Sequence, residues 1–315
     1  MTGLFDLQVN GYAGVDFNDA SITPGALDHA LSSMARAGVA HCLPTIITAP
    51  PEVLSLRFRQ LDRAVADSQL GPLMVPGYHL EGPFLSAEEG YAGCHPADAM
   101  GDPDIGLLET LDSSLSRPML MITLAPERKG AETLIRWATR RGKVVALGHT
   151  AATAHDFERA VNAGASLSTH LGNALRRMQP KFDNPLMLQL AEDRLWASII
   201  ADGVHVPPYA LKVMLRAKGL DRTILVTDAT SGAAASPGVY KFAGMRIERD
   251  SAGAVRVPGS DVLAGSALTL DQAVKNVVGW NLATPDQALR LASHNPRTLL
   301  APALDAHGIQ LTGRS

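Results

Sequence analysis

The chain has 315 residues, and its 28 Lys and Arg residues nearly balance its 31 Asp and Glu residues, which gives a formal net charge of −3. Hydrophobic residues make up 46% and charged residues 19%, a composition that excludes a disordered or fibrous protein. No block of basic residues stands out and no stretch approaches 18 consecutive apolar residues. We therefore expect no nucleic-acid partner and no membrane span.

The sequence has two cysteines, Cys42 and Cys94, which are too few for a disulfide framework and form no CxxC pair. The first residues lack the basic and apolar regions of a secretion signal. These features together predict a cytoplasmic protein.

Short apolar runs alternate with longer helical patterns along the whole chain. The runs predict eight strands, at Phe5–Val9, Val39–Ile47, Met74–Leu80, Met119–Leu124, Val144–Leu147, Ser166–Thr169, Ala197–Ile200 and Ile224–Val226. The patterns between them predict helices at Gly25–Ala37, Pro51–Ala66, Ile105–Leu111, Ala131–Arg140, Ala154–Ala163, Pro185–Asp193 and Pro208–Lys218. Because parallel strands need crossover connections, this alternation favours a (β/α)8 TIM barrel.

A doubly wound open sheet is the alternative fold, but no GxGxxG motif follows the first strand. After the eighth strand, residues 239–257 alternate in hydropathy around two glycines, which predicts a small β-hairpin insertion. Two further helices, Ser266–Val278 and Pro285–Ala292, would close the ring. We expect a single barrel domain over residues 1–315.

Functional groups of such a barrel lie where its strands end. A lone His or Asp after a strand is more often a loop partner or a helix cap, so the signal is that five of the eight strand ends carry such groups. Glu81, His149 and His170 offer one oxygen and two nitrogens, the ligand set of a catalytic divalent metal, and Asp228 could serve as a general base. Glu127 is interpreted instead as a charge at the start of a helix.

Several blocks in order resemble one known family. They are Asp6–Gly11 with Val15–Asp19, Leu43–Thr48, His79–Leu85, Gly148–Thr150, Thr169–Leu171 with Asn173–Ala174, Asp202–His205, Thr227–Ala229 and Leu263–Ser266. Over nearly its whole length the chain resembles the N-acetylglucosamine-6-phosphate deacetylases of the amidohydrolase superfamily. The resemblance implies a barrel of the metal-dependent amidohydrolase type, with the family's small β-sandwich domain largely absent from this chain.

The implied reaction is metal-dependent hydrolysis of the N-acetyl group of N-acetylglucosamine-6-phosphate, or of a close amino-sugar phosphate, to an amine and acetate. The metal ligands carry over to Glu81, His149 and His170, and the catalytic carboxylate to Asp228. The expected substrate contacts are His95, Asn173, Ala174, Lys181 and His205. Lys181 stands where the family has an arginine that reaches the phosphate of the neighbouring subunit, so the resemblance also implies a homodimer.

Gln8 and Asn10 occupy the places where many amidohydrolases have an HxH motif for a second metal. Neutral amides are poor ligands for a dication, so we expect one divalent ion, Zn²⁺ or alternatively Fe²⁺. The family's Lys-Gly-Ala-His reads Ala92–His95 here, and Gly172 stands where a larger residue is usual, which together predict a wider sugar pocket. Two other functions remain open: a deacylase of a non-phosphorylated N-acyl amino sugar or related N-acyl substrate, and a catalytically inactive sugar-binding barrel.

Overall fold

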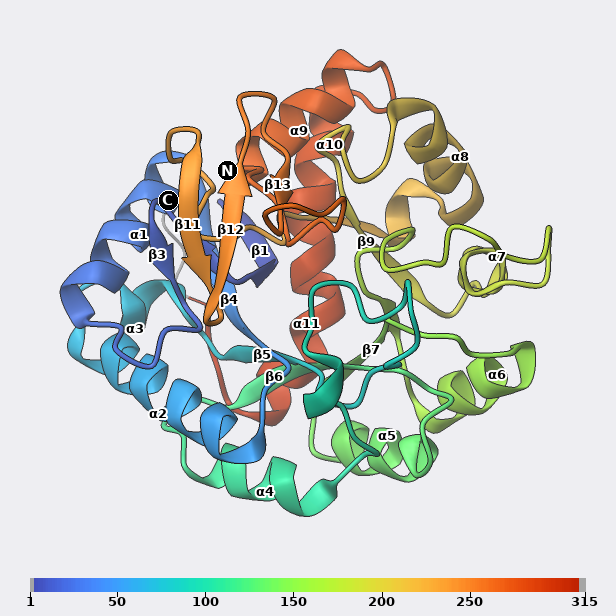
Figure 1. The fold of residues 1–315 in the computed structure, drawn as a ribbon, viewed down its shortest axis with the longest axis horizontal. Coiled ribbons are helices and arrows are strands. Elements are labelled where there is room, and N and C mark those ends of the chain that lie inside the picture. The colour runs from blue at the N-terminus through green and yellow to red at the C-terminus, as the bar shows by residue number, and fades with distance from the viewer. Residues whose placement is uncertain (1–2, 312–315) are drawn as a thin grey trace.

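The computed structural model describes residues 3–311, and its central feature is a parallel eight-stranded sheet. In sheet order, the strands are β1 (Leu4–Val9), β4 (Val39–Ile47), β5 (Tyr78–Glu81), β6 (Met119–Leu124), β7 (Val144–Leu147), β8 (Leu167–Ser168), β9 (Trp196–Ile200) and β10 (Thr223–Val226). Each strand pairs in parallel with its neighbour, and helices surround the sheet (Figure 1). The predicted (β/α)8 barrel is confirmed.

Polar contacts join the first and last strands and bring the barrel close to closure. The Thr227 hydroxyl donates to Asp6 Oδ2 at 2.6 Å, and the Asp228 N–H donates to the carbonyl of Gln8 at 2.9 Å. Burial raises the pKa of Asp6 to about 7, although hydrogen bonds from Thr227 act in the opposite direction. This β1–β10 seam sets the ends of both strands side by side.

The helices cover the outside of the sheet with one apolar face each. α5 shows the pattern, since it buries Leu134, Ile135 and Ala138 and leaves its other faces to solvent. The helices are α1 (Pro24–Arg36), α2 (Pro51–Asp67), α3 (Gly71–Met74), α4 (Ile105–Ser113), α5 (Ala131–Arg140), α6 (Ala154–Ala163), α7 (Pro185–Ala191), α8 (Pro208–Lys218), α9 (Leu270–Gly279), α10 (Pro285–Ala292) and α11 (His294–Ala306).

The third strand and the last helix differ from the sequence prediction. The third strand begins at Tyr78 rather than Met74, because Gly71–Met74 form the short helix α3 with a proline in its first turn. α11 was not predicted, since Pro302 inside it breaks the helical pattern.

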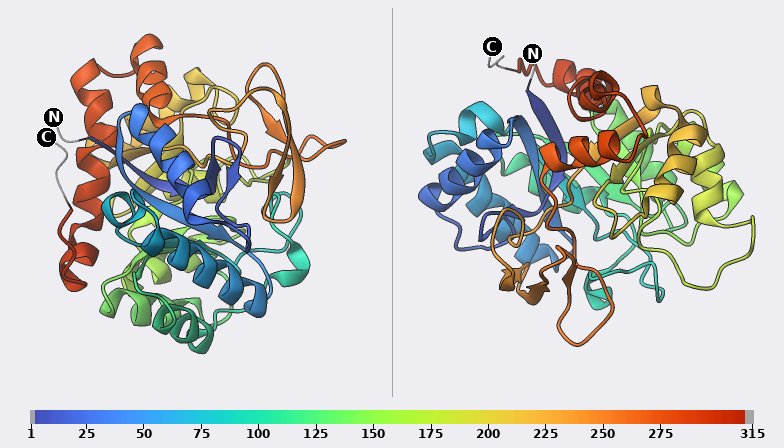
Figure 2. Two further views of the ribbon diagram at one scale, coloured as in Figure 1. Left: turned by 90° about the vertical axis from the view of Figure 1, so that its left-hand side faces the viewer. Right: turned by 90° about the horizontal axis from the view of Figure 1, so that it is seen from above.

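α11 covers the amino-terminal end of the barrel. The side-chain amide of Asn295 donates to the carbonyls of Leu220 and Thr223, at 2.8 and 2.7 Å, where β10 begins. Figure 2 shows α11 on the opposite side of the molecule from the strands of the insertion. The functional end of the barrel is therefore the other one.

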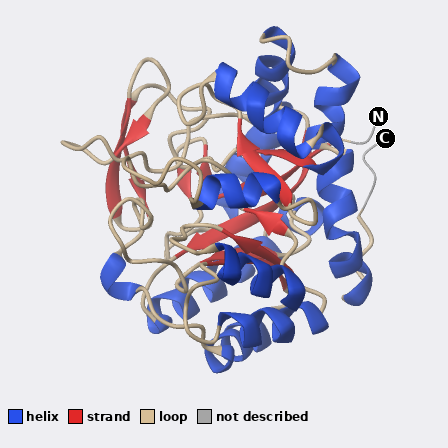
Figure 3. Cartoon of the chain, turned by 90° about the vertical axis from the view of Figure 1, so that its right-hand side faces the viewer, coloured by secondary structure: helices blue, strands red, loops and turns tan. Residues whose placement is uncertain are grey.

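The insertion is a small antiparallel sheet of three strands rather than a simple hairpin. It consists of β11 (Gly238–Phe242), β12 (Met245–Arg249) and β13 (Val255–Arg256), in that order. Phe242, Ile247 and Val255 pack with Ile47 of β4 in a core of their own. Figure 3 shows this sheet among the loops at the carboxyl-terminal end of the barrel strands. A separate short antiparallel pair, β2 (Gly11–Tyr12) and β3 (Val15–Asp16), follows β1.

Among the described residues, no helix is both long and apolar enough to cross a membrane.

Candidate metal centre and active site

Four of the predicted functional residues occupy equivalent places at strand ends. Glu81 is the last residue of β5, and His149, His170 and Asp228 are the second residues after β7, β8 and β10. The last three have positive φ angles of 51°, 28° and 48°. A non-glycine residue in this region costs about 1–3 kcal/mol, so the surrounding contacts must hold these side chains in place.

Glu81, His149 and His170 converge on one point. The Glu81 Oε1 atom lies 3.0 Å from His170 Nε2 and 3.4 Å from His149 Nε2, and the two nitrogens lie 3.1 Å apart. All three residues are buried. The structure thus brings together residues that are 89 positions apart in the chain.

A backbone carbonyl fixes the orientation of His149. Its Nδ1 lies 2.8 Å from the carbonyl oxygen of Tyr91, which can only accept a hydrogen bond. Nδ1 therefore carries the hydrogen, and in the neutral ring Nε2 carries the lone pair that a metal ion needs. Metal-binding histidines commonly donate the N–H of their other ring nitrogen to such a carbonyl.

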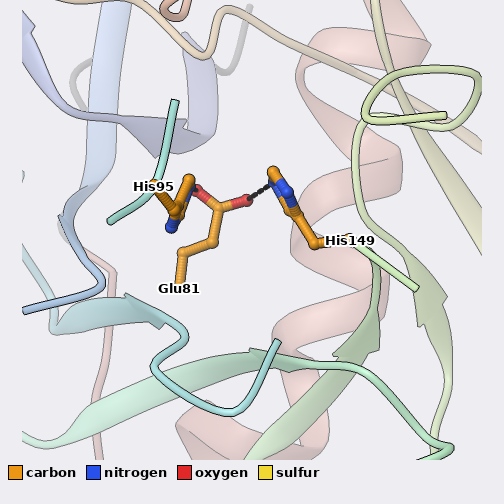
Figure 4. Close-up of side chains that lie close together, drawn as sticks. All are labelled: Glu81, His95 and His149. Carbon is orange, nitrogen blue, oxygen red and sulfur yellow. Dashed lines mark ion pairs between the residues drawn. The ribbon is translucent and has the colours of Figure 1, made fainter. Parts of the chain in front are cut away.

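His95 joins the same group, on the other side of the carboxylate (Figure 4). Its Nε2 lies 3.7 Å from Glu81 Oε2, and the ligand atoms of Glu81, His95 and His149 all lie within 4.8 Å of one another. The Thr48 hydroxyl donates to the Glu81 carbonyl and so accepts from His95 Nδ1 at 2.8 Å. This leaves a lone pair on His95 Nε2, which suits a metal ligand as well as the substrate contact that the sequence predicted.

The donor set fits a divalent cation. One carboxylate oxygen and two or three imidazole nitrogens are ligands that Zn²⁺ takes in catalytic sites. Ligand atoms at tetrahedral positions around zinc are about 3.3 Å apart, as its bond lengths require. The separations of 3.0, 3.1 and 3.4 Å among Glu81, His149 and His170 match that spacing.

The pKa values of the two carboxylates in the site, Glu81 and Asp228, are shifted in opposite directions. Although burial alone would raise the pKa of Glu81, its hydrogen bonds with His149 and His170 hold that pKa well below the usual range. Burial raises the pKa of Asp228 to about 6, and the charge of Glu81 adds to the shift. Burial also lowers the pKa of His95 to about 3, so this ring is neutral. One carboxylate stays charged, and the other can exchange a proton near neutral pH.

These groups open into one cavity of about 1,100 Å³. It is lined by Glu81, His149, His170 and Asp228, and also by the predicted substrate contacts His95, Asn173, Ala174 and His205. His205 is held by Asp202, whose Oδ2 lies 2.6 Å from His205 Nδ1. The Asn173 side chain donates to the carbonyl of His170 at 2.8 Å.

Lys181 is exposed and does not line this cavity, so within one chain it makes no contact there. Arg176 and Arg177, from the loop between β8 and α7, do line it. Arg176 forms an ion pair with Glu88 and lies over the ring of Tyr91, and Arg177 pairs with Asp261 at 3.2 Å. Neither arginine was identified from the sequence, because no local pattern places this loop at the cavity.

The expected widening of the pocket at Gly172 is not found. Gly172 does not line the cavity, and a Cβ atom built on it would lie 2.5 Å from Met214 Cε. The Met214 side chain therefore fills the space that a larger residue at position 172 would need. The prediction from Gly172 was wrong because it considered that position without its neighbour on α8.

Sequence reasoning also missed the role of the two neutral amides at the carboxyl end of β1, Gln8 within the strand and Asn10 directly after it. Gln8 Nε2 and Asn10 Nδ2 both donate to Asp228 Oδ1, at 3.2 and 2.7 Å. Their amide groups identified them as poor metal ligands, but nothing in the pattern showed that they face Asp228 across the β1–β10 seam.

A parallel barrel with a buried carboxylate and imidazole cluster at the carboxyl ends of its strands, beside an aspartate of raised pKa, defines the class of metal-dependent amidohydrolases.

Comparisons with known proteins agree with that class. No family model matches the chain. It is 32% identical to N-acetylgalactosamine-6-phosphate deacetylase of Escherichia coli O157:H7, in an alignment that covers 94% of this chain and 76% of that protein. It is 35% identical to N-acetylglucosamine-6-phosphate deacetylase of Homo sapiens, in an alignment that covers 95% of this chain and 73% of that protein. A structure of N-acetyl-D-glucosamine-6-phosphate deacetylase from Mycobacterium smegmatis, in complex with N-acetyl-D-glucosamine-6-phosphate, superposes with a TM-score of 0.87 at 32% identity, over 95% of this chain and 77% of that one. The chain belongs to the N-acetylglucosamine-6-phosphate deacetylase family.

Proposed function

We propose that this chain hydrolyses the N-acetyl group of N-acetylglucosamine-6-phosphate, or of a closely related amino-sugar 6-phosphate, to acetate and the free amine. The observation that carries the proposal is the convergence of Glu81, His149 and His170 in the cavity that Asp228 also lines. The activities named for the relatives support the choice of substrate. Neither a non-phosphorylated substrate nor an inactive barrel has comparable support.

We assign Glu81, His149 and His170 as the ligands of one divalent ion, Zn²⁺ in preference to Fe²⁺, with His95 as an additional donor on the same carboxylate. Bound there, the ion would act as a Lewis acid that lowers the pKa of a water molecule and polarises the amide carbonyl. Gln8 and Asn10 donate hydrogen bonds to Asp228 through their NH₂ groups, and their neutral amide oxygens are poor ligands for a second dication.

Asp228 moves the proton in this proposal. As a carboxylate it takes a proton from the attacking water while the new C–O bond forms. It then gives that proton to the amide nitrogen as the C–N bond breaks, because an amine leaves poorly unless it is protonated. The raised pKa of Asp228, about 6, suits a group that must both accept and release a proton near neutral pH.

The sugar phosphate would lie in the rest of the cavity. Asn173, Ala174 and His205 line it beyond the metal ligands, and we assign the phosphate to them. The His205 imidazole is held at the cavity wall by Asp202, whose Oδ2 lies 2.6 Å from His205 Nδ1. His95, next to the carboxylate, would contact the N-acetyl group or a sugar hydroxyl.

The deciding experiment compares acetate release from N-acetylglucosamine-6-phosphate, N-acetylgalactosamine-6-phosphate and unphosphorylated N-acetylglucosamine, as kcat/KM of the zinc-loaded chain. We expect a strong preference for the phosphorylated sugars. Similar values with and without phosphate would favour the deacylase of non-phosphorylated substrates. No acetate from any of them would favour the inactive barrel.

A homodimer is part of the proposal, with Lys181 contacting the phosphate in the partner's cavity. The neighbours Met178 and Phe182 are 87% and 76% exposed, which is unusual for large apolar side chains and suits a surface buried in a dimer. Light scattering of the protein as it elutes from a size-exclusion column would give its mass in solution. We expect the mass of a dimer, and that of a monomer for Phe182→Ser.

We place the chain in the cytoplasm. Cys42 and Cys94 are both free, which fits a reducing compartment. Fractionation of cells that express the tagged chain would test this placement.

A further inference from the structure

Glu127 has a different environment from the one its sequence position suggested. α5 begins at Ala131, after Gly130 in a left-handed conformation, and the acidic residue in its first turn is Glu132. Glu127 lies three residues beyond the end of β6 and outside the helix. Its carboxylate therefore does not serve the helix start, and its actual contacts lie elsewhere.

Both carboxylate oxygens of Glu127 accept hydrogen bonds from the residues directly after His149. The Thr150 hydroxyl donates to Oε2 at 2.5 Å, and the Ala151 N–H donates to Oε1 at 2.7 Å. Thr150 Oγ1 in turn accepts from the Ala152 N–H at 2.9 Å. Within residues 3–311, no lysine or arginine forms an ion pair with Glu127. The contacts of this carboxylate are directed to one loop.

That loop connects β7 to α6 and carries a residue in a strained conformation. His149 has a φ of 51°, which a residue with a Cβ atom adopts only when its surroundings impose it. Before His149, the Gly148 N–H donates to the carbonyl of Leu124 at 3.2 Å, and the His149 carbonyl itself accepts from the Ser86 N–H at 2.9 Å. Thr150 and Ala151, on the other side, are held by Glu127. A turn fixed at both ends leaves the His149 ring little freedom.

We propose that Glu127 is a positioning residue for His149: through Thr150 and Ala151 it imposes the turn that aims His149 Nε2 at Glu81 and His170. This inference rests on the proposed function, in which these three residues hold the metal ion. Glu127 borders a separate cavity of about 360 Å³ and does not line the large one, so it acts on the ion through the loop rather than as a ligand.

The alternative is that Glu127 merely stabilises the fold. In that case its loss would lower the melting temperature of the metal-free chain and leave its affinity for zinc unchanged. A positioning role predicts that the zinc affinity falls even in a well-folded chain, because a displaced imidazole weakens the metal site. Zinc affinity and metal-free melting temperature therefore separate the two roles without any measurement of turnover.

The experiment measures the zinc dissociation constant by competition with a chromophoric chelator, and the melting temperature without metal. For Glu127→Ala we expect a zinc dissociation constant about 10–100-fold higher, the usual effect of losing a group that orients a metal ligand. Glu127→Gln should bind zinc much as the wild type does, because its amide oxygen can accept from Ala151 and its NH₂ can donate to Thr150 Oγ1. The matched control is Glu132→Gln, a nearby glutamate on α5 that has no contact with the β7–α6 turn, which should leave the zinc dissociation constant unchanged.

Unchanged zinc affinity in a folded Glu127→Ala chain would overturn the inference. If that variant does not fold, Thr150→Val is the second test, since it keeps the side-chain shape and removes the hydrogen bond to Glu127 together with the one from Ala152. A wild-type chain that binds no zinc would instead overturn the proposed function, and the inference with it. The two failures are therefore distinguishable.

Discussion

Asn10 donates a hydrogen bond of 2.7 Å to Asp228 Oδ1 across the β1–β10 seam. Gln8 donates to the same oxygen at 3.2 Å, so Oδ2 is the oxygen we expect to accept a proton. The two amides of the motif that replaces HxH thus orient the proposed base. This relationship links the closure of the barrel to catalysis.

Asp228→Asn should keep its zinc and lose activity. A positioned general base contributes about 10²- to 10⁴-fold, so kcat should fall by that factor while elemental analysis still finds about one equivalent of metal. Asn10→Ala should cost less, about 10- to 100-fold, the contribution of one hydrogen bond to a charged group. The exposed Asp221→Asn is the control, and normal turnover in Asp228→Asn would remove this residue from the mechanism.

Zinc should stabilise the folded chain through Glu81. A ligand that binds the native state alone adds stability in proportion to the logarithm of its concentration over its dissociation constant. A chelator should therefore lower the melting temperature of the wild type and have little effect on Glu81→Gln. The same shift in both proteins would show that the metal binds elsewhere.

Asn295→Ala should destabilise the barrel from its amino-terminal end. The variant leaves the carbonyls of Leu220 and Thr223 without their buried donor, which costs about 1–3 kcal/mol of the free energy of unfolding. Denaturant unfolding measures the change. Thr298→Ala, an exposed change on the same helix, should stay within about 0.5 kcal/mol of the wild type, and equal effects of the two would contradict the contact.

Asp6 should make stability depend on pH. Burial raises its folded pKa to about 7 from a usual value of 3.8, so the folded state binds the proton more tightly than the unfolded state. The contribution of protonated Asp6 to the free energy of unfolding is fully present below about pH 4 and is lost as the pH rises towards 7. Compared with Asp6→Asn, the wild type should lose up to about 1.4 kcal/mol per pH unit in that window. Parallel pH profiles of the two proteins would contradict the shift.

The sequence by itself determined the barrel and most of its elements. Strands with buried faces and helices with one apolar face leave periodic patterns that are local, and β6, β7 and α5 begin and end where those patterns do. The ligand types were also visible, since a carboxylate and two imidazoles follow separate strands and parallel strands present their ends together.

Tertiary structure alone decided what those residues touch. The contacts of Gln8 and Asn10 with Asp228, of Glu127 with the turn after His149, and of Met214 with Gly172 join residues that are distant in the chain or on separate elements. Such contacts depend on how strands close and loops pack, which no local pattern records. The same reason hid α11, whose Pro302 interrupts the helical pattern while packing against the barrel holds the helix in place.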